Sequence, residues 1–246
     1  LTNAIQDIGS SAYSGGSISN ASASAQSINV ALTLAAGHHA GSTVSGAGQL
    51  NLAGTFTRSA GGTLQHLLNG GAVNYTGSGL ANDASGILGG WATIGLGVNA
   101  GNWTTLSSGN ASAYSGYLNK SGGTSMALSS SGGNATSNVK INTRSSTAST
   151  LNGTTSGTYD ANTLMWNIGG SNPSGDQTLN ISSGQILRLG VNGAVMNVHC
   201  ASRTFNLGNG SSGTVTAGGA ANTAGELSLY AVPLDDKNQR LKINTV

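Results

Sequence analysis

The sequence predicts an all-β solenoid, a fold in which many short strands stack along one axis. Two observations carry this prediction. Of the 246 residues, 126 are Gly, Ser, Thr or Asn, yet short alternations of apolar and polar residues recur along the chain. A flexible polar linker would lack the alternation, and an ordinary globular domain would carry more charge and aromatic mass. Short strands with small polar residues in their turns and outer faces account for both observations.

The first strands are predicted over 27–34 and 49–56, where every second residue is apolar. In the first of these, Ile28, Val30, Leu32 and Leu34 would share one face. Gly-rich breaks separate the strands and supply their turns. The alternation continues in chain order at Val139/Ile141, Leu164/Trp166/Ile168, Leu179/Ile181, Leu187/Leu189/Val191, Val195/Val198, Phe205/Leu207, Leu227/Leu229 and Leu241/Ile243.

Two all-β architectures fit such strands. A sandwich usually needs hairpin turns and a core about 10 Å thick that aromatics help to fill. Only two Phe, three Trp and six Tyr are present, so a narrower parallel β-helix is favoured, with like Asn, Ser or Thr side chains hydrogen-bonding along its axis. At about 20 to 25 residues per coil, the chain would form roughly ten coils. We therefore expect a single elongated domain over 1–246, with a polar excursion around 107–158.

Several segments resemble one family. Residues 56–63 (FTRSAGGT), 86–95 (GILGGWATIG) and 102–104 resemble a signature of bacterial autotransporter-associated β-strand repeat proteins. The C-terminal segments 186–195, 215–219, 225–230 and 241–246 resemble the strand repeat of the same family. The resemblance implies a right-handed parallel β-helix in a secreted or surface-exposed bacterial protein, and it implies no catalytic residues.

Two tryptophans in these segments have two interpretations. Gly89 and Gly90 before Trp91 allow a tight or left-handed backbone that turns the indole back onto the stack. Trp91 and Trp103 would then be structural clamps at a corner or over an end. Alternatively, their indole faces are a platform on which sugar rings stack.

The charged residues argue against an enzyme and against nucleic-acid binding. Nine Lys and Arg and seven Asp and Glu give a net charge of +2, and the basic residues are scattered singly. A glycosidase needs two carboxylates held close together, but only Asp235 and Asp236 are adjacent, in a predicted solvated turn. His38 and His39 are expected on opposite faces of an extended strand, so no metal site or cofactor is predicted.

The remaining expectations concern location and partners. We expect an extracellular or cell-surface protein without a membrane-spanning segment, with Cys200 as a buried thiol. An uncapped solenoid end exposes strand edges, so the first interpretation is a structural building block of a filament, matrix or surface fibre that self-associates. The second is an adhesin that binds glycans or a cell-surface polymer, and a distant third is ice binding. The candidate subunit-contact residues are Leu1, Ile5, Ile8, Leu241, Ile243 and Val246.

Overall fold

The computed structural model describes residues 6–7, 16–43, 48–96, 99–128, 134–143, 147–152, 155–167, 176–199, 204–208, 210, 213–233 and 240–244. This part of the chain contains strands, turns, bends and irregular segments, and no helix. Where the sequence predicted one domain, the chain divides into two compact units, Leu1–Ser115 and Gly116–Val246. Each unit is described by itself, and a single continuous solenoid stays a prediction.

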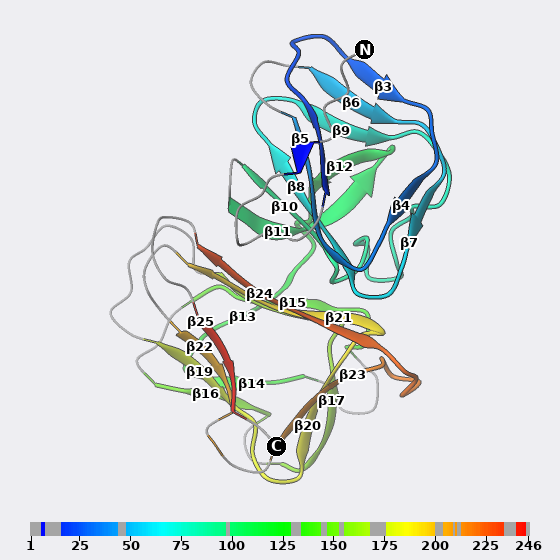
Figure 1. Ribbon diagram of the computed structural model, residues 1–246. Helices are drawn as coiled ribbons and strands as arrows, with labels where there is room; N and C mark the ends of the chain where they lie inside the picture. Colours follow the sequence, from blue (N-terminus) through cyan, green and yellow to red (C-terminus); the bar gives the residue numbers. More distant parts are fainter. Residues whose placement is uncertain are drawn as a thin grey trace. The chain divides into compact units, whose positions relative to one another are not determined.

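The first unit is built from three parallel stacks through which the chain passes in turn (Figure 1). A coil is one passage through the three stacks, and consecutive coils pair 24 residues apart at Leu32 and Phe56. The first stack contains β2 (Gly16–Asn20), β5 (Gly37–Thr43), β8 (Gly62–Leu68) and β10 (Ala92–Leu96). The second contains β3 (Gln26–Ile28), β6 (Gln49–Leu52) and β9 (Ala72–Tyr75), and the third contains β4 (Leu32–Leu34) and β7 (Phe56–Arg58).

An antiparallel hairpin ends this unit. β11 (Asn99–Ser107) pairs antiparallel with β10, and β12 (Asn110–Ala113) pairs antiparallel with both β11 and β9. The hairpin therefore joins the last strands of the first and second stacks and covers the edges that they would otherwise leave. At the other end of the unit, β1 (Gln6–Asp7) pairs antiparallel with Gly16 and Ser17 of β2.

The second unit contains three stacks in which every pairing is parallel (Figure 1). The first stack contains β13 (Leu118–Lys120), β15 (Asn138–Ile141), β18 (Thr163–Asn167), β21 (Asn192–His199) and β24 (Glu226–Pro233). The second contains β14 (Ser125–Met126), β16 (Ser149–Leu151), β19 (Gln177–Asn180), β22 (Thr204–Leu207) and β25 (Arg240–Ile243). The third contains β17 (Gly157–Asp160), β20 (Gln185–Leu189) and β23 (Thr214–Ala217). The chain is thus all-β with stacked parallel sheets, a solenoid-like arrangement.

The stretch 107–158, expected as a polar excursion, contributes strands to both units. β12 belongs to the hairpin of the first unit, and β13 to β17 belong to the stacks of the second. Apolar residues at the inward positions explain this, because Val139, Ile141 and Leu151 are fully buried in the core of the second unit. The polar composition of this stretch comes from its turns and outward positions.

The cores contain aliphatic columns that run from coil to coil, as the alternation predicted, together with buried aromatic side chains such as Trp166 and Phe205. Val139, Leu164 and Val195 are direct neighbours across three strands, and all three are fully buried. The prediction of an inward-facing side chain is wrong at two positions, since Val30 is 64% exposed and Val191 is 46% exposed. Both lie at corners between strands, where the backbone turns and the two-residue period of a strand no longer applies.

Polar ladders run outside the cores, at strands and corners. The Thr33 and Thr57 hydroxyls lie 3.0 Å apart on neighbouring coils, and Asn162 Nδ2 donates to Asn138 Oδ1 at 3.0 Å. The predicted stacking of like side chains is confirmed at these positions. Gly190 lies on the next coil after Asn138 and Asn162. A Cβ atom at this position would collide with Asn162 Oδ1.

The backbone hydrogen bonds give each coil a direction. Inward-facing residues bond to the following coil: Phe56 N–H donates to Ser78 C=O, and Leu64 N–H donates to Trp91 C=O. The second unit follows the same rule, since Leu207 C=O accepts from Asn244 N–H. Because successive residues of a strand bond to opposite sides, outward-facing residues bond to the preceding coil.

Candidate functional site

In the part of the chain that the structure describes, the last coil of the second unit has hydrogen-bonded neighbours on one side only. Within the described ranges, β23, β24 and β25 are each the terminal strand of their sheets. We call the three edges together the open end. Inward-facing residues bond to the following coil, so those of β23, β24 and β25 direct their backbone N–H and C=O groups toward the open end. An unpaired strand edge with such groups is a ready template for another strand.

The core is also open at this end. Leu179 and Leu207 are fully buried, whereas Ile243, the next residue in the same column, is 37% exposed. Val195 is fully buried, whereas its neighbour Leu229 on β24 is 50% exposed. Each column loses its cover at the last coil, over which no further coil lies among the described residues.

Two of the predicted subunit-contact residues lie at the open end. Leu241 and Ile243 are both on β25, and Leu241 packs partly buried against the core of the second unit. The other four, Leu1, Ile5, Ile8 and Val246, lie outside the described residues, as does Cys200.

Leu229 is the residue of the open end that sequence reasoning did not select. The alternation of Leu227 and Leu229 predicted a strand, but nothing in that pattern distinguishes the last strand of a stack from an internal one. Coil lengths differ, from 21 residues between Leu118 and Val139 to 36 between Thr204 and Arg240. The position at which a column ends therefore could not be counted along the sequence.

The two candidate sugar-stacking tryptophans are covered by protein. Trp103 is fully buried on β11 of the closing hairpin, and Trp91 is 5% exposed. The Arg58 guanidinium carbon lies 5.0 Å from the Trp91 ring centroid, and Gly89 takes a φ of 119° before it. An indole needs an open face to stack on a sugar, so this burial favours the clamp interpretation of both residues.

A polar network lies inside the first unit around His66, which is fully buried. His66 Nδ1 lies 3.2 Å from Thr93 C=O and 3.1 Å from Thr104 Oγ1, and Nε2 lies 2.7 Å from Tyr75 Oη. The Thr93 carbonyl can only accept, so Nδ1 carries the proton and neutral Nε2 accepts from the Tyr75 hydroxyl. Burial lowers the pKa of His66 from 6.5 to about 4. The imidazole is therefore neutral near pH 7.

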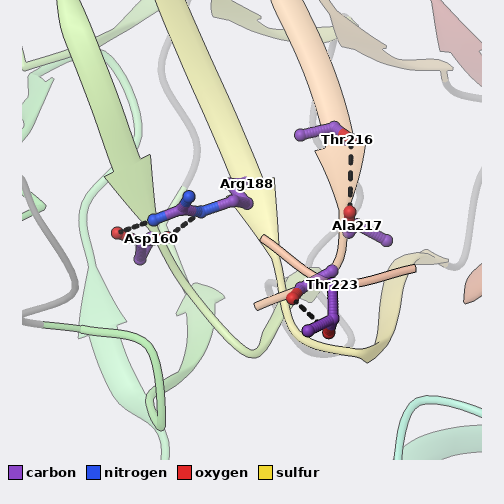
Figure 2. Close-up of polar contacts among 6 residues, drawn as sticks. Asp160, Arg188, Thr216, Ala217 and Thr223 are labelled. Atoms are coloured by element: carbon purple, nitrogen blue, oxygen red, sulfur yellow. Dashed lines mark hydrogen bonds and ion pairs between the residues drawn. The ribbon is translucent and has the colours of Figure 1, made fainter. Parts of the chain in front are cut away.

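Three acidic side chains of the described part make structural contacts. Asp160, almost fully buried, accepts from Arg188 Nε at 2.7 Å and from Nη2 at 3.2 Å across neighbouring strands (Figure 2). This hydrogen bond is the main cause of the raised pKa of Arg188. Asp83 Oδ1 accepts from Ser85 N–H at 2.8 Å within a turn, and Asp176 Oδ1 accepts from Thr204 N–H at 2.9 Å.

The paired histidines are separately bonded. His38 Nδ1 lies 2.9 Å from Thr63 Oγ1, and His39 Nε2 lies 3.0 Å from Ala35 C=O. Burial lowers the pKa of His38. Across the ranges that the structure describes, no group of three or more His, Cys, Asp and Glu side chains is arranged to hold a metal ion. In the same ranges no helix has the length and apolar character needed to span a membrane.

Comparison of the chain with protein-family models, with curated proteins and with solved structures found no match in any of the three. The open end is thus the feature on which a functional conclusion rests.

Proposed function

We propose that this protein is a non-catalytic building block of an extracellular filament, matrix or cell-surface fibre. It self-associates end to end through strand edges. In this proposal each unit is a right-handed parallel β-helix, with roughly ten coils in the chain. The resemblance to bacterial autotransporter-associated repeats supports the handedness and the location. The observation that carries the proposal is the open end, where Leu229 and Ile243 are exposed although Val195 and Leu207, their neighbours on the preceding coil, are fully buried.

The exposed side chains alone are too few for tight binding. Burying the exposed parts of two aliphatic side chains contributes about 2 kcal/mol, whereas a micromolar complex needs about 8 kcal/mol. The larger part must come from the backbone ladder along the edges and from burial of a whole coil cross-section. The proposal therefore requires a partner that presents strand edges from more than one stack of a coil.

An adhesin that binds glycans through Trp91 and Trp103 is the less favoured function. Both indoles are covered in the first unit, so that role would require a different aromatic surface.

Sedimentation of the full chain over a wide concentration range tests the proposal. The wild type is expected to form larger species as concentration rises, with filaments visible by electron microscopy. A Leu229→Lys/Ile243→Lys variant is expected to stay monomeric, because charged side chains block an edge. Val191→Lys is the matched control, since Val191 is similarly exposed but lies outside the last coil. A wild-type chain that remains monomeric at its highest soluble concentration would refute the proposal.

A further inference from the structure

The open end offers a defined pattern of hydrogen-bonding groups. Lys242 and Asn244 direct their backbone N–H and C=O groups toward β22. Asn244 N–H donates to Leu207 C=O, and residues two apart in a strand form backbone hydrogen bonds on the same side. Leu241 and Ile243 therefore direct their N–H and C=O groups away from β22, along the open edge of β25. Their side chains face inward, above Phe205 and Leu207.

The first coil of the first unit offers the complementary pattern. β3 is the terminal strand of its sheet in the described chain. Ala53 N–H donates to Ile28 C=O, so Ile28 bonds to the following coil. The neighbouring residues, Ser27 and Asn29, then direct their N–H and C=O groups toward the free side of β3. Both β3 and β25 are the second strand of their coils.

From these patterns we infer that the open end binds the first coil of a second copy, with β25 pairing parallel to β3. This inference rests on the proposed function and names the partner surface. Placing Ile243 opposite Ile28 sets inward side chain against inward side chain. In the same register, Ile243 N–H reaches Ser27 C=O and Ile243 C=O accepts from Asn29 N–H. Side-chain direction and hydrogen-bond direction agree at one register, as they do between coils of one chain.

Charge favours this partner over a second open end. The described open end carries Glu226, Arg240 and Lys242, and a contact between two open ends would double these charges at one edge. Like charges placed side by side on neighbouring strands destabilise the pairing. Residues 16–34, which contain β2, β3 and β4 of the first coil, include no Asp, Glu, Lys or Arg. The charged residue described beside this coil is Asp7, on the strand β1 that pairs with β2. The first coil therefore brings one carboxylate, and no further cation, to the edge that carries Arg240 and Lys242.

Cross-linking between two different variants tests this register. In the inferred pairing, Lys242 lies opposite Ser27, about 4.8 Å away between neighbouring strands, which is within disulfide range. Both variants are full-length chains that also carry Cys200→Ser. A mixture of Ser27→Cys and Lys242→Cys chains is expected to form a disulfide-linked heterodimer under mild oxidation, and neither alone is expected to form a linked homodimer. Val191→Cys, mixed with Ser27→Cys, is the mismatched control and should give no heterodimer.

The outcomes separate this inference from the function on which it rests. Linked Lys242→Cys homodimers would show that two open ends meet, which overturns the inference but leaves self-association intact. Wild-type self-association with no Ser27–Lys242 cross-link above the Val191 control also overturns the inference alone. A wild-type chain that never associates overturns both. Ile243→Pro, which removes one edge N–H, should abolish association, whereas Ile243→Val should retain it.

Discussion

Acid should destabilise the first unit through His66. The imidazole is fully buried and neutral, with a pKa lowered by burial from 6.5 to about 4. Between these two values the unfolded chain binds a proton that the folded chain does not. Stability is therefore complete above about pH 6.5, falls as the pH decreases toward 4, and loses no more from this residue below that.

The magnitude follows from the two pKa values. One pKa unit corresponds to 1.36 kcal/mol, so the whole shift is worth about 3 kcal/mol. Between about pH 6 and 4.5 the free energy of unfolding should fall by close to about 1.36 kcal/mol per pH unit. Protonation would also remove Nε2 as the acceptor of the Tyr75 hydroxyl, which lies 2.7 Å away.

Urea unfolding between pH 4 and 8 measures this effect. In a Trp166→Phe background the remaining indoles, Trp91 and Trp103, both lie in the first unit, so their fluorescence follows that unit. The control is His66→Gln, which keeps a donor and an acceptor but does not titrate. His38 titrates in both chains, so the difference between them isolates His66. Equal pH dependence in the two chains would refute the assignment of a buried neutral imidazole.

Two further substitutions test the second unit, with the fluorescence of buried Trp166 as the readout of urea unfolding. Gly190→Ala should lower the free energy of unfolding by about 2 kcal/mol, because the added Cβ meets Asn162 Oδ1. A smaller loss in an Asn162→Ala background would identify that contact as the cause. An unchanged loss in that background would reject it. Asp160→Asn should cost about 1 to 2 kcal/mol by weakening the bidentate pair with the partly solvated Arg188, and an unchanged midpoint would show that the pair contributes nothing.

Sequence reasoning predicted the parts of the fold that follow from local alternation. Leu164, Trp166, Leu187 and Leu189 were expected inside, and all are fully buried. Alternation is a reliable signal there because a strand places successive side chains on opposite faces. It failed at Val30, where the polar–apolar pattern continues although the chain turns a corner.

Contacts between coils could not be predicted in the same way. Asp160 and Arg188 are 28 residues apart in sequence and become neighbours only because β17 and β20 pair. Coil length varies along the chain, so no fixed period connects the two residues. The antiparallel hairpin was also missed, since the apolar pattern of β11 does not differ from that of a parallel strand.

In the proposed assembly, the hairpin of the first unit and the open end of the second unit together explain why further copies would add in one direction. A parallel coil can be continued only by a strand that accepts its hydrogen-bond direction and covers its columns. In the first unit the antiparallel β11 and β12 occupy the last edges of two stacks, so no parallel strand can follow there. In the described part of the second unit the last coil keeps the parallel pattern to its edge. In the inferred contact, the free backbone groups of its inward residues would meet those of Ser27 on β3, and a second open end does not offer such groups in the same direction. The two contacting surfaces therefore differ, and a contact between unlike surfaces repeats from copy to copy unless its rotation closes a ring.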